Sequence, residues 1–369
     1  MKLTISESEN LKVIYGESTY PYYIYTPRWI ETSAGIKALH FLCHSLNLSG
    51  QKAFLVFSEK RFNNLPRVNP NLLTPILDQE TADAHFKSGL TPLVVYSETV
   101  PGNPLGGTAV VRYLMNFAGA LGGEKSFLES ELVFAFSKAI SADYSKHVDI
   151  EAPVLFLPPI DPRDFIFSET KEDYQVVYAG KYRSFIGIPP KVGFLKSFEV
   201  YRDGPRMQSR EKVIRLLNKA SVVYCFENTS IITEAILSGT PVCIVKSDFM
   251  TEVIAEHELG THGTSKTLEK EDIEVARSTV NLGRDAYFKS IEKYSESLES
   301  FIKETQFFAF ANGYENQIQI PTFNEMGMVT VHRRELAKQI YRNQGVITLI
   351  RVFYHFLARR LAWRYWLGR

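Results

Sequence analysis

Several polar residues that could take part in chemistry follow the segment 222–226. The residues of this segment are β-branched, aromatic or otherwise apolar, so they suit a buried parallel strand. Turn and helix-capping residues come next, then a short helix that Gly239 ends. In open α/β sheets, ligands bind outside the carboxyl ends of strands. We therefore expect a ligand site here. Its candidate residues are Glu227, Asn228, Thr229 and Glu234.

A glycine with two basic neighbours stands in a similar position, directly after the apolar segment 174–179. Gly180 lets the backbone approach a ligand, and Lys181 and Arg183 supply positive charge for a diphosphate. We expect the two basic side chains to take part in chemistry. The alternative interpretation of the same residues is a solvated basic turn.

A third polar loop, residues 97–107, follows the apolar segment 92–96. Glu98 could act as the base that deprotonates an acceptor hydroxyl, or it could cap the loop by accepting backbone N–H groups. Asn103 lies in this loop, and Arg112 lies on the helix that we expect after it. Gly35, at the start of an early helix, is a weaker candidate for an anion site.

The elements that must position these residues alternate between strands and helices in both halves of the chain, which is typical of an α/β fold with parallel sheets. A helix over 35–48 and strands over 20–26, 53–57, 92–96, 132–136 and 154–157 are expected in the first half. The proline-rich segment 158–162 predicts a stiff linker. Strands near 174–179, 198–201, 222–226 and 241–245, a helix near 209–218 and charged surface helices over 269–305 follow.

The stretch around Glu234 resembles a known motif. Glu234-Ala235 followed by Ser238-Gly239-Thr240-Pro241-Val242 is similar to the nucleotide-sugar motif of glycosyltransferases with the two-domain GT-B fold. The family pattern has a second glutamate earlier, in the slot of Phe226, and Glu227 stands one position later. The resemblance implies that Glu234 hydrogen-bonds the donor ribose. It also implies that a basic residue at the place of Lys181 and Arg183 binds the donor phosphates.

The loop around Glu98 resembles a recurrent element of bacterial surface-polysaccharide glycosyltransferases, of O-antigen or capsule type. The matching residues are Tyr96, Glu98, Val100, Gly102, Asn103, Pro104, Leu105, Val110, Val111, Arg112, Tyr113 and Leu114. Together the two resemblances imply two Rossmann-like domains facing across a cleft, with a C-terminal amphipathic helix. The expected parts are an acceptor domain over 1–160, a nucleotide-sugar donor domain over 161–325 and a membrane-associating tail over 326–369.

Composition and missing motifs exclude several other classes. The net charge of +1 over 369 residues leaves no global field for nucleic acid. The three cysteines are scattered, which indicates a reducing compartment, and neither a signal peptide nor a spanning apolar run is recognised. No P-loop, dinucleotide fingerprint or serine-hydrolase motif occurs. His40 and His44 have metal-pair spacing but are expected on the surface, so we expect neither a metal nor a cofactor.

The C-terminal residues 336–369 contain seven basic side chains and no acidic one. Residues 346–367 fit a helix with a broad apolar arc that basic residues interrupt near its end, which suits the interface of an anionic bilayer. The side chains expected there are Arg351, Arg359, Arg360, Trp363, Arg364 and Trp366. The alternative is that this helix packs back on the first half of the chain.

These observations lead to one expected function. The chain would transfer a sugar from a nucleotide-sugar donor to a polysaccharide or lipid-linked glycan acceptor, in the cytoplasm and peripheral on the inner face of the membrane. A sugar-nucleotide epimerase of the same fold is one alternative, and a non-catalytic binding module of that fold is another. Glu98, Lys181 and Arg183 are the expected catalytic residues. Asn103 and Arg112 belong to the acceptor loop.

Overall fold

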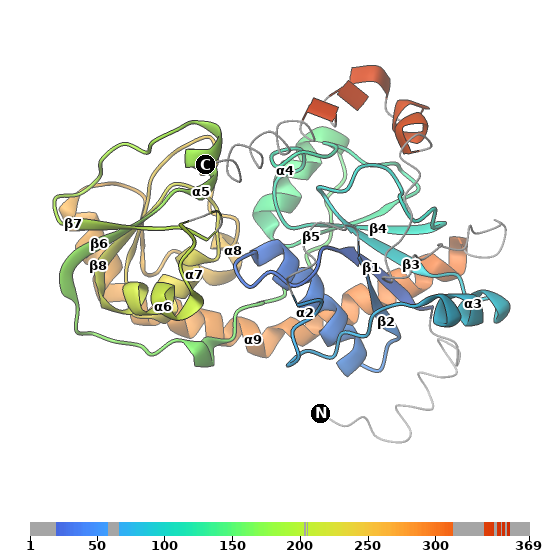
Figure 1. The fold of residues 1–369 in the computed structure, drawn as a ribbon, viewed down its shortest axis with the longest axis horizontal. Helices are drawn as coiled ribbons and strands as arrows, with labels where there is room; N and C mark the ends of the chain where they lie inside the picture. Colours follow the sequence, from blue (N-terminus) through green and yellow to red (C-terminus); the bar gives the residue numbers. More distant parts are fainter. Residues whose placement is uncertain are drawn as a thin grey trace.

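A computed structural model shows two α/β domains joined by a short linker and by one long helix (Figure 1). It describes residues 20–57, 66–202, 204, 206–312, 336–342, 345–347, 349–350 and 353–354. Each domain contains a five-stranded parallel sheet, so the expected pair of parallel α/β domains is confirmed. In the described part of the chain, no helix combines the length and the apolar character needed to cross a bilayer.

The first sheet has the strand order β2-β1-β3-β4-β5. Its strands are β1 (Tyr22–Thr26), β2 (Ala53–Phe57), β3 (Leu93–Ser97), β4 (Ala109–Leu114) and β5 (Leu132–Ala135). The accompanying helices are α2 (Ala34–Leu48), α3 (Gln79–Lys87) and α4 (Lys138–Val148). Ser33, Asp78 and Ser137 cap these helices through their side chains. Strands β1, β3 and β4 are buried throughout, which explains their continuous apolar sequences.

The second sheet has the order β10-β9-β8-β6-β7. Its strands are β6 (Glu172–Tyr178), β7 (Lys196–Val200), β8 (Ala220–Cys225), β9 (Val242–Ile244) and β10 (Thr264–Ser265). The helices are η1 (Pro162–Asp164), α5 (Gly180–Phe185), α6 (Arg210–Lys219), α7 (Ile231–Leu237) and α8 (Glu256–Leu259). Gly239 follows α7 with a φ of 78°, and a Cβ there would lie 2.7 Å from the Ser168 carbonyl oxygen. This position therefore requires glycine.

Helix α9 (Lys270–Asn312) runs along both domains (Figure 1). Its first part packs on the second sheet through Val280, and its last part enters the core of the first domain through Leu298 and Phe301. Tyr287 holds the linker, because its hydroxyl donates to the Ile160 carbonyl oxygen over 2.8 Å. The predicted helical structure over 269–305 is therefore confirmed, but it is one helix that is partly buried and not several surface helices. One helix ties the two domains together, and its buried residues are spaced among many charged ones.

Three further local predictions were wrong. Residues 110–114 form strand β4 and not a helix, because both faces of this strand are buried and no period-2 alternation shows. The residues around Val154 make a single bridge to Ala135 instead of a strand. His40, which was predicted on the surface, is fully buried beside Trp29, and its Nε2 forms a hydrogen bond of 3.1 Å with the Pro27 carbonyl oxygen. Burial lowers the pKa of His40 to about 4.

Candidate functional site

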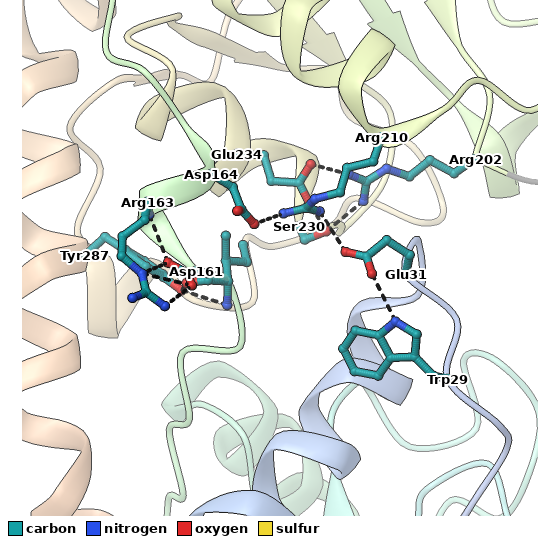
Figure 2. Close-up of polar contacts among 11 residues, drawn as sticks. Trp29, Glu31, Asp161, Arg163, Asp164, Arg202, Arg210, Ser230, Glu234 and Tyr287 are labelled. Carbon is teal, nitrogen blue, oxygen red and sulfur yellow. Dashed lines mark hydrogen bonds and ion pairs between the residues drawn. The ribbon is translucent and has the colours of Figure 1, made fainter. Parts of the chain in front are cut away.

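Glu234 is buried in the first turn of α7, close to the carboxyl end of β8. Its carboxylate pairs with the guanidinium of Arg202, which follows β7. The Ser230 hydroxyl accepts from Arg202 Nη1 (2.8 Å) and donates to Glu234 Oε1 (2.9 Å), as Figure 2 shows. The three side chains form a closed triad at the strand ends of the second sheet. The resemblance predicts that the Glu234 carboxylate contacts the donor ribose. In the structure this carboxylate pairs with Arg202, and the ribose contact stays a prediction.

The electrostatics of this triad extend into the first domain. Burial would raise the pKa of Glu234, but Arg202 and Lys37 outweigh it and hold that pKa below its usual range. Lys37 is a buried residue of α2, 4 % exposed. Burial lowers the pKa of Lys37. Glu234 opposes this effect, whereas Arg210 and Arg202 lower the pKa of Lys37 further. A lysine of one domain therefore lies in the field of a carboxylate of the other.

Arg210 makes a second connection between the domains (Figure 2). Its Nη1 lies 3.2 Å from Glu31 Oε1, in the loop after β1, and its other amino group pairs with Asp164 of η1. Glu31 also accepts from Trp29 Nε1 over 2.9 Å. Charged residues from three separate segments thus converge at the boundary of the domains. We refer to the junction cluster, defined as Glu31, Lys37, Asp164, Arg202, Arg210, Ser230 and Glu234.

The basic residues of this region have hydrogen-bonding capacity to spare. The Nε atom of Arg202 is buried and has no hydrogen-bond partner among the described residues. The same holds for the Nε atom of Arg28, a buried residue of the loop after β1. Buried donors without partners are costly in a folded protein, and an anionic ligand would satisfy them. This chemistry suits phosphate oxygens, which guanidinium and ammonium groups bind well.

Glu227 has a different environment from Glu234. It is buried and caps α5, where it accepts the backbone N–H of Lys181, and it lies 3.5 Å from that lysine's Nζ. Burial raises the pKa of Glu227, and Lys181 opposes this effect. Lys181 Nζ also donates to the Asn228 carbonyl oxygen over 3.1 Å. The protein's own carboxylate therefore occupies the start of α5, beside Gly180, where the prediction places a diphosphate.

The other residues predicted around the donor also have internal partners. Arg183 lies on α5 and not in a turn, and it makes two 2.6 Å hydrogen bonds to Glu199 of β7. The Asn228 side chain binds the Glu252 carbonyl oxygen and the Ile254 N–H, and Thr229 Oγ1 accepts the N–H of residue 231. These contacts fix the turn between β8 and α7. They leave the ligand roles of Arg183, Asn228 and Thr229 as predictions.

Glu98 is buried after β3, and its Oε2 accepts the Met115 N–H over 3.0 Å. This contact supports the capping alternative. Asn103 shapes the same loop: its Oδ1 accepts from the Tyr96 hydroxyl (2.8 Å), and its Nδ2 donates to the Gly107 carbonyl oxygen (2.6 Å). Both residues thus hold the loop 98–107 in place. Gly35 lies in α2, where a Cβ would make an ordinary contact with Met115 at 3.7 Å.

Arg112 is the largest fully buried side chain of the molecule's described part. It lies on β4 and pairs with Glu131 through Nε (2.9 Å) and Nη2 (2.8 Å). It also donates to the carbonyl oxygens of Val100 and Gly102, and its guanidinium lies against two aromatic rings. The two bonds to carbonyl oxygens hold the loop onto the sheet. The predicted helix is therefore corrected, because Arg112 lies on strand β4, and its role toward an acceptor stays a prediction.

The described part of the tail packs on this loop. Asn103 donates its backbone N–H to Gln339 Oε1 over 3.2 Å, and Ile340 is buried. Gly102 has a φ of 61°, and a Cβ there would lie 2.7 Å from Leu336 Cδ1. Residues 336–342 thus pack on the first domain, and the placement of the helix predicted over 346–367 stays a prediction. The tail residues predicted at a membrane, Arg351, Arg359, Arg360, Trp363, Arg364 and Trp366, lie outside the described residues.

Sequence reasoning missed the residues that connect the domains. Lys37 has a sequence signal, because it is a lysine within a helix whose other buried positions are mostly apolar. Arg202 follows a strand, as Glu98 and Glu227 do, so the same strand-end rule could have selected it. Arg210 carries no such signal, since its partners Glu31 and Asp164 are distant in sequence.

No protein-family model matches the chain, and no curated protein sequence matches it. Solved structures of similar arrangement do exist. One is WaaG, a glycosyltransferase involved in lipopolysaccharide biosynthesis (13 % identity, 77 % of this chain and 98 % of that one, TM-score 0.42). Another is the glycosyltransferase SnogD from Streptomyces nogalater (12 % identity, 79 % of this chain and 100 % of that one, TM-score 0.38). A third is Os79 from O. sativa in complex with a trichothecene (9 % identity, 77 % of this chain and 100 % of that one, TM-score 0.42).

Proposed function

We propose that the chain is a glycosyltransferase that uses a nucleotide-sugar donor, and that the donor diphosphate binds at the junction cluster. One observation carries the proposal: the buried Lys37 of the first domain lies in the field of Glu234 at the strand ends of the second. The neighbouring Arg202 has an unpartnered buried Nε. Buried cationic groups contributed by two domains are well suited to an anion that lies between them.

The chemistry follows from charge. When the sugar leaves, negative charge develops on the departing nucleotide diphosphate, and fixed cationic groups stabilise it without reorganising. In our proposal Lys37 and Arg202 are these groups. Glu234 acts as a positioning residue, because its carboxylate and the Ser230 hydroxyl orient the guanidinium of Arg202. Lys181 lies on the second domain, and its ammonium is held by Glu227 and the Asn228 carbonyl oxygen.

Calorimetry with nucleoside diphosphates tests the proposed donor site. We expect the chain to bind at least one of them, and the variant Lys37→Met to lose at least about tenfold in affinity, the equivalent of about 1.4 kcal/mol. Lys87→Met, at an exposed position of α3 in the same domain, is the matched control and should bind like the parent. Failure of all the common nucleoside diphosphates to bind would contradict the proposal.

We also propose that the acceptor is a polysaccharide or lipid-linked glycan and that the tail docks on an anionic membrane. Described tail residues support this: Val346, Ile347, Ile350 and Phe353 are each more than half exposed. Residues 336–369 contain no acidic side chain. Flotation with anionic liposomes tests it, because a chain ended at Gly345 should bind much less than the full chain. Equal flotation of the two would contradict this placement.

A non-catalytic binding module of the same fold is a second candidate. The internal pairing of Glu234 with Arg202, and of Arg183 with Glu199, favours it, since the expected ligand groups are already satisfied. Product analysis separates the possibilities. A transferase needs an acceptor to turn over the donor efficiently, an epimerase converts the donor alone, and a binding module leaves the donor unchanged.

A further inference from the structure

Residues 185–196, which run from the last residue of α5 to the first residue of β7, expose an unusual number of large apolar side chains. We call this segment the apolar loop. Phe185 (54 %), Ile186 (50 %), Ile188 (84 %), Phe194 (104 %) and Leu195 (38 %) are all exposed. Five large apolar side chains are thus exposed within residues 185–196, and a gathering of exposed apolar side chains marks interaction sites on soluble proteins.

The loop is anchored, so these side chains are held outward. Val192 is buried in the core of the second domain, and its carbonyl oxygen accepts from the side chain of the buried Gln175. Gly193 follows with a φ of 64°, and a Cβ there would lie 2.1 Å from Gln175 Oε1, so the backbone packs tightly on the sheet at this point. Two prolines at 189 and 190 stiffen the preceding turn. Ile188 and Phe194, on either side of the anchor, therefore stand in solvent.

The charges around the loop identify its partner. Lys191 and Lys196 are exposed among the apolar side chains, and no acidic residue occurs between positions 174 and 198. Apolar tips flanked by lysines suit an anionic bilayer, because the apolar groups enter the acyl boundary while the ammonium groups contact headgroup phosphates. Each such lysine is attracted to the negative surface potential of an anionic leaflet.

We infer that the apolar loop is a second membrane-contact site, on the domain opposite the one that carries the tail, and that it binds an anionic lipid surface. In Figure 1, α5 and the described part of the tail (red) both lie in the upper half of the view. The inference rests on the membrane placement proposed above, but it concerns different residues.

The test uses the full chain and vesicles of phosphatidylglycerol and phosphatidylcholine. The double variant Ile188→Asp and Phe194→Asp should lower the vesicle partition coefficient at least about tenfold, since two apolar side chains leave the acyl boundary. The matched control is Ile166→Asp together with Val275→Asp, which alters two apolar residues of the second half of the chain that are also more than half exposed. The control should float like the parent. Equal flotation of the loop variant and the control would overturn the inference.

A second measurement does not depend on loss of binding. The three native cysteines are buried, so Phe194→Cys can be labelled selectively with an environment-sensitive fluorophore. Its emission should shift to the blue on adding anionic vesicles, whereas the same label at Ile166→Cys should not change. Absence of a shift at position 194, or a loop variant that converts a dimer to a monomer without changing flotation, would overturn the inference. Nucleotide affinity, measured in parallel, reports separately on the proposed donor site.

Discussion

The loop after β3 and the segment from the end of β8 into α7 each carry a buried carboxylate near the carboxyl end of a strand, but Glu98 and Glu234 have different partners. Glu98 accepts a backbone N–H of its own domain, and Arg112 holds the surrounding loop. Glu234 pairs with Arg202 and is also stabilised by Lys37 of the other domain. A carboxylate near a strand end therefore marks a junction between domains only when a basic residue of the other domain lies close enough to stabilise it. The first region is a loop held by internal contacts, and the second contains our proposed donor site.

The largest expected effect belongs to the first region. Arg112→Met should destabilise the protein by about 3–5 kcal/mol, because Glu131 is left buried without its partner. Urea unfolding measures this loss. Arg163→Met, at an exposed ion pair with Asp161, is the control and should leave the unfolding midpoint unchanged. If Arg112→Met lost nucleotide affinity while remaining folded, the distinction between a structural loop and a site would be wrong.

Glu234→Gln should combine a smaller loss of stability with a loss of function. Removing one partner of a buried pair leaves Arg202 uncompensated, at a cost of about 2–4 kcal/mol. Nucleotide affinity should fall at least about tenfold, and any transfer rate should fall with it. Glu98→Gln tests the contrast, since it should retain nucleotide affinity. Equal affinities of the two variants would remove the distinction between the regions.

The two carboxylates of the second region should respond to acid in opposite directions. The folded-state pKa of Glu234 lies below the ordinary 4.5, so its stabilising contribution is present at neutral pH and is lost as the pH falls below about 4.5. Burial raises the pKa of Glu227, so its contribution is complete below 4.5 and is lost as the pH rises above it.

Unfolding of Glu234→Gln and Glu227→Gln at pH 7 and pH 4 measures this difference. On acidification, the destabilisation caused by Glu234→Gln should shrink, and that caused by Glu227→Gln should grow. The parent protein measured at each pH is the reference, so that other titrating groups cancel. Parallel changes in the two variants would show that the carboxylates share one environment.

The smallest expected effect is at Arg210, which is partly exposed and pairs with Glu31 and Asp164. Arg210→Gln should cost less than about 1 kcal/mol of stability, and the difference should fade at high salt. Since Arg210 links the domains, small-angle scattering at low salt should show a larger radius of gyration for the variant. An unchanged scattering profile would show that α9 alone sets the arrangement of the domains.

Local patterns predicted most of the fold. Strand β8, the Gly239 stop and helix α2 follow from residues that are close in sequence, because propensity and capping act locally. The sequence of β4 was misassigned, since a strand that is buried on both faces has no alternation. The burial of helix α9 was not predicted, because the buried positions of Phe301 and Leu298 stand among many charged residues.

The site was less predictable than the fold. Glu234 and Glu227 could be selected from a strand-end rule, but their partners could not. Lys37 is nearly two hundred residues from Glu234, and only the packing of two domains brings their charges together. Arg112 shows the reverse case, because a conspicuous charged residue in a motif proved to satisfy backbone carbonyls.

Calorimetric titration of Lys37→Met with the best-binding nucleoside diphosphate tests the central claim most directly. Lys37 belongs to the first domain, whereas the motif around Glu234 belongs to the second. If the donor diphosphate binds at the junction, Lys37→Met should lose at least about tenfold in affinity, while Lys87→Met binds like the parent. An affinity for Lys37→Met equal to that of the parent would contradict a donor site between the two domains.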